Sequence, residues 1–163
     1  MIINEIIIRT TLRPGDIGYI SHLHGIIYNR EYQYGNEFEV YVANGLIEFY
    51  NNYDPKRDCL WICEHLKSII GFMLLMHRTE RVAQLRFFLL QPEYRGIGLG
   101  NKLMLLYIAF LKSHEYKSAY LWTTNELPVA AHLYMKYGFR LTEEKSSSHL
   151  GKPVIEQRYD LIL

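Results

Sequence analysis

The chain has 163 residues, of which 49% are hydrophobic and 21% are charged, a length and balance that predict one globular domain over residues 1–163 and exclude extended disorder. The 18 lysine and arginine residues nearly cancel the 17 acidic ones, and the formal net charge is +1. Nucleic-acid binding through bulk positive charge is therefore excluded, because phosphate binding needs a concentrated positive surface.

Several features favour a cytoplasmic protein without a membrane partner. No segment approaches the roughly 20 apolar residues of a membrane span. The first residues are apolar but lack the positively charged start of a signal peptide. Cys59 and Cys63 fall in one predicted strand, about 13 Å apart at roughly 3.3 Å per residue, which is too far for a disulfide. The histidines lack the spacing of metal ligands, so we expect no metal.

Hydrophobic periodicity predicts alternating strands and helices along the chain. The middle of the sequence has short apolar runs separated by brief polar turns, which is typical of antiparallel strands. In chain order, the predicted elements are a strand at 2–10, helices at 15–32 and 37–51, strands at 59–65, 69–78 and 82–90, a helix at 97–115, a strand at 118–124, a helix at 129–137, and strands at 140–145 and 155–161.

This order, β-α-α-β-β-β-α-β-α-β-β, places the chain in the α/β class with a mixed sheet. The strand at 82–90, the helix at 97–115 and the strand at 118–124 make a β-α-β unit. Such a unit should be parallel and right-handed. The final two strands are expected to form a hairpin.

The segment over residues 89–103 carries the strongest chemical signal. A strand ends there, a turn with Gly96, Gly98 and Gly100 follows, and a helix begins. The free amides and the dipole of a helix start form an anion site, and glycines let a phosphate approach the backbone. A Walker loop is excluded because Lys-Ser/Thr does not follow the last glycine, and a dinucleotide fingerprint is excluded because Asn101 replaces its third glycine. If the glycines are considered without the rest of the pattern, the alternative is a tight turn that binds no ligand.

The full pattern resembles a known superfamily. The string Arg-x-x-Gly-x-Gly at residues 95–100 is similar to motif A of the GNAT (Gcn5-related N-acetyltransferase) superfamily, the loop that binds the pyrophosphate of acetyl-CoA. The string Ala-x-x-x-Tyr-x-x-x-Gly-Phe at residues 130–139 resembles the family's helix after the fifth strand. The element order agrees along the whole chain. Phrases at residues 12–18 and 121–123 look closest to acetyltransferase domains fused to MarR-type regulators, but no regulator part is present and no DNA binding is transferred.

The resemblance implies that the fourth and fifth strands splay apart and that the pantetheine arm of acetyl-CoA lies in the gap. Phe88, Leu89 and Leu90 would offer backbone groups to the pantetheine. The Leu90 amide, nearest the thioester, would take a catalytic role by stabilising the negative charge on its oxygen. Arg95 would shape the loop or contact a phosphate. The amides expected to hold the diphosphate are those of Gly96, Ile97, Gly98, Leu99, Gly100 and Asn101.

The resemblance also assigns a catalytic role to Tyr134, which would protonate the departing thiolate of coenzyme A. A phenol suits this task because its reference pKa lies within about two units of that of a thiol. Many relatives carry an asparagine seven positions before the tyrosine, where this chain has Leu127. Asn125 is therefore the only candidate for that contact with the coenzyme.

The acceptor side is less defined. Tyr28, Glu31 and Tyr32 lie where the family's acceptor sites are found and are candidates for substrate binding. Glu31, Glu80 and Glu126 are candidates for a general base, with a solvated surface acid as the alternative for each.

The resemblance implies direct transfer of an acetyl group from acetyl-CoA to an amine of a small molecule or peptide, without a covalent enzyme intermediate. The alternative is a non-catalytic acyl-CoA-binding sensor or interaction module, and the tyrosine at position 134 favours the enzyme. Relatives often pair, so a homodimer through the C-terminal strands stays open.

Overall fold

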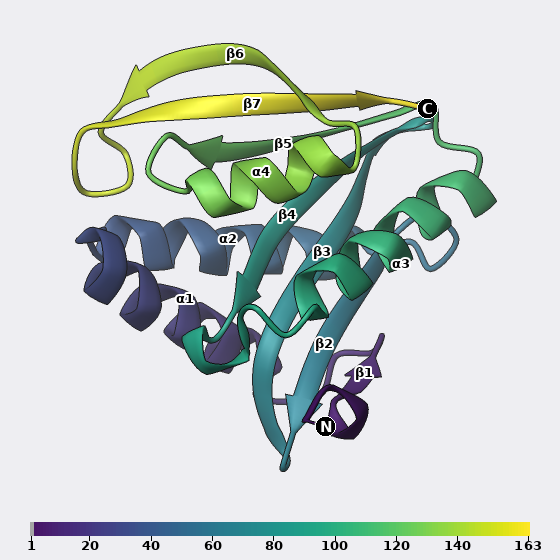
Figure 1. Ribbon diagram of the computed structural model, residues 1–163, viewed down its shortest axis with the longest axis horizontal. Coiled ribbons are helices and arrows are strands. Elements are labelled where there is room, and N and C mark those ends of the chain that lie inside the picture. The colour runs from purple at the N-terminus through teal and green to yellow at the C-terminus, as the bar shows by residue number, and fades with distance from the viewer. Residues whose placement is uncertain (1) are drawn as a thin grey trace.

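The computed structural model describes residues 2–163, which build a seven-stranded sheet in the order β1-β2-β3-β4-β5-β7-β6 (Figure 1). The predicted class, element order and final hairpin are confirmed. The helices are α1 (Asp16–Tyr32), α2 (Asn36–Asn52), α3 (Leu99–Ser113) and α4 (Pro128–Lys136). The strands are β1 (Ile7–Arg9), β2 (Cys59–His65), β3 (Ser68–Thr79), β4 (Val82–Leu90), β5 (Ser118–Thr124), β6 (Arg140–Ser147) and β7 (Val154–Ile162).

The predicted first strand over residues 2–10 is wrong in its first half. Ile2–Glu5 forms a short 3-10 turn, and only Ile7–Arg9 pairs with β2. The pairing places Ile7 opposite Glu64, and β2 ends one residue later at His65. Residues before Ile6 therefore have no strand to pair with, however apolar they are. No helix over residues 2–163 combines the length and apolar run that crossing a membrane requires.

Helices cover both faces of the sheet, with α1 and α2 on one side and α3 and α4 on the other (Figure 1). Strand β3 is buried on both faces because its residues alternate between the two layers. Phe72 and Leu74 join the core beneath α1 and α2, whereas Met73 and Leu75 join the core beneath α3. This explains the continuous apolar run of β3, which differs from the alternation of a half-exposed strand.

Strands β4 and β5 are parallel and then diverge, as predicted. They pair only from Val82 opposite Ser118 to Gln84 opposite Tyr120. Strand β4 continues to Leu90 without a partner on this side, while β5 stays paired with β7 along its other edge. The divergence opens a gap in the middle of the sheet.

A bulge bends β4 beside this gap. Leu89 lies opposite Phe72, and Arg86 lies opposite Leu74. Between these two pairs, β4 therefore contains one more residue than β3. Phe87, within the bulge, has a φ of 56°, which few non-glycine residues adopt. The extra residue shifts the side chains of β4 that line the gap.

Candidate active site

A backbone anion site lies at the start of α3. Gly98 caps this helix with a φ of 90° and offers no side chain, and the first bond of the helix runs from the Lys102 amide to the Gly98 carbonyl at 3.1 Å. The amides of residues 99–101 therefore have no partner within the helix. The helix begins two residues later than predicted because the chain is left-handed at Gly98. Free donors at the positive end of a 15-residue helix suit a phosphate group.

The turn leaves the space that such a ligand needs. Gly96 also has a positive φ, 75°, and a Cβ there would meet nothing within 4 Å. A cavity of about 510 Å³ adjoins the turn, and we call it the glycine-loop cavity. The predicted coenzyme residues that line it are Phe88, Leu89, Leu90, Arg95, Gly96, Gly98, Gly100 and Asn101.

Three predicted coenzyme residues do not line this cavity. The Leu99 side chain is buried in the core and the Ile97 side chain is partly exposed, so the prediction for both concerns their amides alone. Asn125 lies apart, beside the β6–β7 connection. The backbone amide of Asn125 donates to the Ile155 carbonyl at 3.0 Å, and its side-chain Oδ1 accepts from the backbone amide of Ile155 at 3.3 Å. The structure does not bring Asn125 to the glycine loop.

Helix α4 supplies wall residues that the sequence analysis did not predict. His132, Leu133 and Lys136 line the glycine-loop cavity. The Lys136 Nζ donates to the Asn101 Oδ1 at 2.7 Å, so it lies beside the start of α3. His132 and Lys136 are four residues apart and thus share one helix face, a spacing that could have pointed to them.

The backbone of β4 faces the gap at Leu90. The next amide, that of Gln91, donates to the Ile70 carbonyl on the β3 side at 2.9 Å. Successive amides of a strand point to opposite edges, so the Leu90 amide points toward the gap. The Leu90 carbonyl points the same way and accepts from the Arg95 Nε at 3.0 Å.

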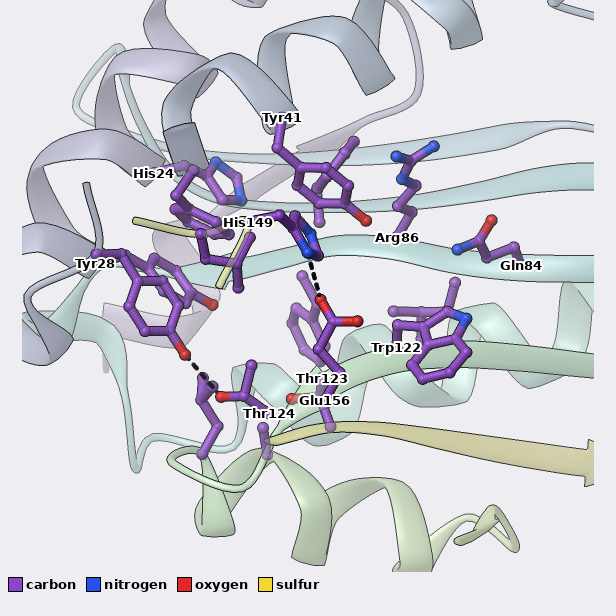
Figure 2. Close-up of a pocket in the computed structure, with 18 of the residues that line it drawn as sticks. His24, Tyr28, Tyr41, Gln84, Arg86, Trp122, Thr123, Thr124, His149 and Glu156 are labelled. Atoms are coloured by element: carbon purple, nitrogen blue, oxygen red, sulfur yellow. Dashed lines mark hydrogen bonds and ion pairs between the residues drawn. The ribbon is translucent and has the colours of Figure 1, made fainter. Parts of the chain in front are cut away.

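A second, smaller cavity of about 110 Å³ lies in the gap on the side of α1 and α2, and we call it the inner cavity (Figure 2). Its wall residues come from helices α1, α2 and α4, from strands β4, β5 and β7, and from the α1–α2, β5–α4 and β6–β7 connections. Those with polar side chains include His24, Tyr28, Tyr34, Tyr41, Gln84, Arg86, Thr123, Thr124, Tyr134, His149 and Glu156. The residues that line both cavities are Tyr28, Phe88, Leu127, Ala130 and Tyr134. Tyr134 therefore lies in the wall where the two cavities meet.

Burial keeps Tyr134 protonated. Its side chain is 6% exposed, and this burial raises the pKa of the phenol well above its ordinary value. Tyr137, three residues later, has its hydroxyl engaged by the Asn101 carbonyl at 3.1 Å, and it lines neither cavity. Of these two tyrosines, Tyr134 alone is placed to donate a proton into the cavities.

Neither cysteine is placed to act as a nucleophile. Burial raises the pKa of Cys59 to about 11 and that of Cys63 to about 12, so both are neutral thiols at physiological pH. Neither lines the glycine-loop cavity or the inner cavity. Residues 2–163 contain no group of three or more histidine, cysteine or acidic side chains placed to hold a metal ion.

The predicted acceptor residues divide between the cavities. Tyr28 lines both, and Tyr32 lines the glycine-loop cavity. Glu31 lines neither, and its carboxylate is bound by the Arg95 Nη1 at 2.9 and 3.0 Å. This pair ties the turn after β4 to the end of α1. Glu126 pairs with Lys152 at 2.7 Å outside both cavities, so the structure does not place it as a general base. The third candidate base, Glu80, is exposed in the β3–β4 turn.

His24 presents an unpaired ring nitrogen. Its Nδ1 lies 2.8 Å from the Ile20 carbonyl, which can only accept, so Nδ1 carries the proton and Nε2 carries a lone pair. His24 is 1% exposed, lines the inner cavity, and its buried Nε2 has no partner among the described residues. Burial lowers the pKa of His24 from 6.5 to about 4, so the ring is neutral at physiological pH.

This buried imidazole should make stability depend on pH. The folded-state pKa lies below the unfolded value of 6.5, so His24 contributes stability that is fully present above pH 6.5 and is lost as the pH falls toward 4. We expect a loss on the order of 3 kcal/mol in the free energy of unfolding over that window. Denaturant unfolding at several pH values should show a smaller loss for His24→Gln. His22→Gln, an exposed change on the same helix, should keep the wild-type slope, and equal slopes for all three proteins would contradict the assignment.

Comparison with known proteins identifies the family. The model of the acetyltransferase (GNAT) family matches residues 22–139, and the chain belongs to that family. Membership indicates an acetyl-CoA-dependent acyltransferase. No curated protein matches the sequence significantly.

Solved structures agree in fold. An acetyltransferase from Streptococcus agalactiae has a TM-score of 0.79 and 19% identity, covering 98% of this chain and 99% of its own. A GNAT family acetyltransferase from Elizabethkingia anophelis with acetyl-CoA bound has a TM-score of 0.66 and 18% identity, with coverages of 98% and 99%. Spermidine N-acetyltransferase from Vibrio cholerae, in complex with CoA and spermine, has a TM-score of 0.71 and 22% identity, with coverages of 98% and 96%.

Proposed function

We propose that this protein is an N-acetyltransferase that moves the acetyl group of acetyl-CoA directly to an amine of a small molecule or peptide. The observation that carries the proposal is the shared wall of the two cavities at Tyr134. The coenzyme would occupy the glycine-loop cavity and the acceptor the inner cavity. Their reacting groups would then meet beside a buried, protonated phenol.

The residues at the glycine loop fit the coenzyme. Its diphosphate would be held by the amides that open α3, with the positive side chain of Lys136 beside them. The free edge of β4 from Leu85 to Leu90 would pair with the amide groups of the pantetheine arm. Acetyl-CoA, once bound, supplies an acyl group activated as a thioester.

The chain's own groups account for the chemistry. The Leu90 amide would donate a hydrogen bond to the acyl oxygen as negative charge develops there. Tyr134 would give its proton to the sulfur of coenzyme A as the thiol leaves, while the attacking amine would release its proton to water and the phenol would regain one from water. Transfer would be direct, as the family resemblance implies, and both cysteines are neutral thiols that line neither cavity.

Other expectations remain proposals. Strand β6 is the edge of the sheet and is largely exposed, which supports a homodimer formed through the C-terminal strands. We also propose a cytoplasmic location, consistent with two free cysteines, and no nucleic-acid, membrane or metal partner. The special likeness to domains fused to MarR-type regulators stays a prediction.

Thiol release from acetyl-CoA tests the proposed activity. We expect release that depends on both the enzyme and an added amine, over a panel of amino acids, polyamines, aminoglycosides and peptides. Mass spectrometry should find the acetyl group on nitrogen in the product. Tight acetyl-CoA binding without release for any amine would instead indicate the non-catalytic sensor.

A further inference from the structure

Building on the proposed acetyl transfer, we propose that the acceptor is a small amine that also carries a carboxylate, and that Arg86 binds this carboxylate in the inner cavity. Two buried polar atoms of side chains that line the inner cavity, the Arg86 Nε and the His24 Nε2, have no partner within residues 2–163. One is a charged donor and the other is an acceptor. Leaving such groups unpaired away from water is costly, so a ligand that pairs both is favoured.

Arg86 is held in place before any ligand arrives. Its Nη1 donates to the Glu48 Oε2 at 2.8 Å, and its guanidinium carbon lies 5.0 Å from the ring centroid of Tyr41 and 4.8 Å from that of Phe87. Gly45 of α2 makes room for this arrangement, because a Cβ there would lie 3.1 Å from the guanidinium carbon. A fixed guanidinium with an unused Nε–H is well suited to a carboxylate oxygen.

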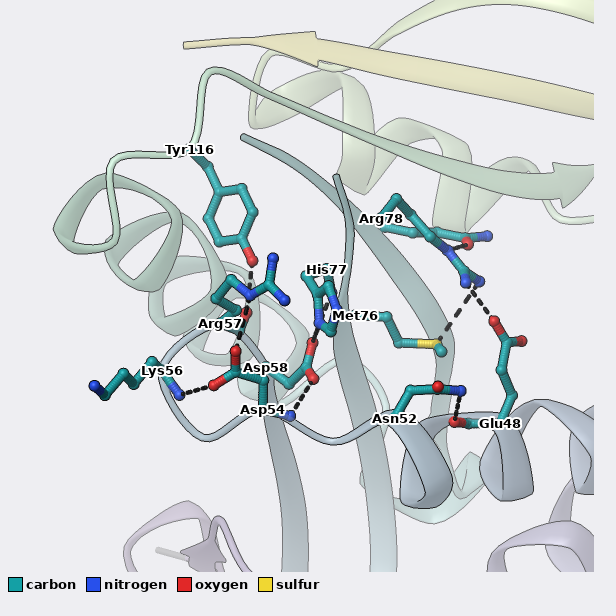
Figure 3. Close-up of polar contacts among 11 residues, drawn as sticks. Glu48, Asn52, Asp54, Lys56, Arg57, Asp58, Met76, His77, Arg78 and Tyr116 are labelled. Carbon is teal, nitrogen blue, oxygen red and sulfur yellow. Dashed lines mark hydrogen bonds and ion pairs between the residues drawn. The ribbon is translucent and has the colours of Figure 1, made fainter. Parts of the chain in front are cut away.

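The charge around Arg86 is not balanced. Glu48 accepts hydrogen bonds from both Arg78 and Arg86 (Figure 3 shows the Arg78 bond). Burial alone would raise the pKa of Glu48, but the two guanidinium groups outweigh it and lower the pKa, so the carboxylate is ionised. Two positive charges thus share one negative charge, and this cluster, of which Arg86 lines the inner cavity, keeps an excess of one positive charge.

The acidic group of the cavity does not cancel this excess. Glu156 is already engaged by His149 at 3.0 Å and by Lys145 at 3.4 Å (Figure 2 shows the His149 contact). A ligand with an anionic end therefore restores the balance at Arg86. A polyamine would instead place a second positive charge in the cavity, and we expect it to be a poor acceptor.

His24 provides the matching contact for the amine. Its Nε2 lone pair can accept a hydrogen bond from an N–H of the acceptor. The His24 and Arg86 side chains both lie against Phe87, at 5.9 Å between the ring centroids of His24 and Phe87 and 4.8 Å for Arg86. Both unpaired atoms thus belong to side chains that lie against one aromatic ring. We expect a molecule with a few bonds between amine and carboxylate to contact both, and the cavity volume of about 110 Å³ admits a molecule of that size.

Matched acceptor pairs test this inference. Glycine, β-alanine and 4-aminobutyrate are each compared with their carboxamide, which has the same shape without the charge, and spermidine is included. Thiol release gives kcat/KM for each. We expect at least one acid to exceed its carboxamide by about tenfold or more, and spermidine to react poorly.

Replacing Arg86 shows whether this side chain sets the preference. Arg86→Met keeps the apolar stem, and we expect the ratio of acid to carboxamide to fall about 10- to 100-fold. The ratio is taken within one protein, so a change in folded fraction cancels. Arg86→Lys keeps the charge and should lose less of the ratio. Arg57→Met makes the same chemical change in a separate cluster, where Arg57 pairs with Asp54 (Figure 3), and should leave the ratio unchanged.

Three results overturn the inference. They are carboxamides or spermidine reacting better than every acid, an unaltered ratio in both Arg86 variants, and no turnover of any acid by a protein that binds acetyl-CoA. The last leaves the coenzyme site standing, whereas failure to bind acetyl-CoA in calorimetry removes the proposed function itself.

Discussion

Replacing Tyr134 by phenylalanine is expected to lower kcat by about 10²–10⁴-fold, the range typical of a lost general acid, while the affinity for acetyl-CoA stays nearly unchanged. The substitution removes only the hydroxyl, so the packing of the ring against Phe88 and Phe139 is kept. The thiolate would then leave without a proton. Single-turnover thiol release isolates this step from product release.

Tyr107→Phe is the matched control for this experiment. Tyr107 is also buried, its ring also lies near Phe139, and its hydroxyl has no partner among the described residues. It lines neither cavity, and we expect its loss of hydroxyl to leave kcat close to wild type. If Tyr134→Phe and Tyr107→Phe turn over equally fast, Tyr134 has no part in proton transfer.

Gly98→Glu should abolish measurable acetyl-CoA binding. We expect the affinity to fall by at least about 100-fold, because the substitution adds both a repelling charge and backbone strain. A side chain at a φ of 90° is strained, and a carboxylate there lies at the start of α3, where the diphosphate would bind. Calorimetry measures the loss. Gly98→Ala has the strain without the charge and should weaken binding less.

Gly18→Glu serves as the charge-matched control. Gly18 is an exposed residue of α1, and a Cβ there would meet nothing within 4 Å. Its affinity for acetyl-CoA should equal that of the wild-type protein. Unaltered affinity in Gly98→Glu would show that the phosphates bind elsewhere.

Local patterns predicted much of the fold. Strands β2, β4 and β5 have the predicted bounds, because each is an apolar run between polar residues that form turns or loops. The residues next to these strands in the sequence therefore determine where each strand begins and ends. The first strand failed for the opposite reason: its length depends on where β2 ends, more than fifty residues away, and nothing in residues 2–10 encodes that limit.

The same division holds for the site. The turn at Gly96 and Gly98 is a contiguous backbone feature, so its string of residues predicted it. The inner cavity is assembled from distant elements, and no local pattern joins His24 of α1 to Arg86 of β4 or Glu156 of β7. Such a site can be recognised only in the folded structure, in which β4 and β5 stop pairing and diverge.

Two candidate residues show how position in sequence can mislead. Asn125 directly follows β5, close in sequence to α4, but its side chain and backbone bond to Ile155 near the β6–β7 connection. Glu31 lies at the end of α1 as expected, but Arg95 holds its carboxylate. In both cases a tertiary partner, which the sequence does not reveal, decides where the polar group points.

A crystal structure of the protein with acetyl-CoA tests the central claim most directly. We predict the diphosphate within hydrogen-bond distance of the amides of residues 98–101, and the thioester between the Leu90 amide and the Tyr134 hydroxyl. A diphosphate bound away from the start of α3, or a thioester far from Tyr134, would contradict the account.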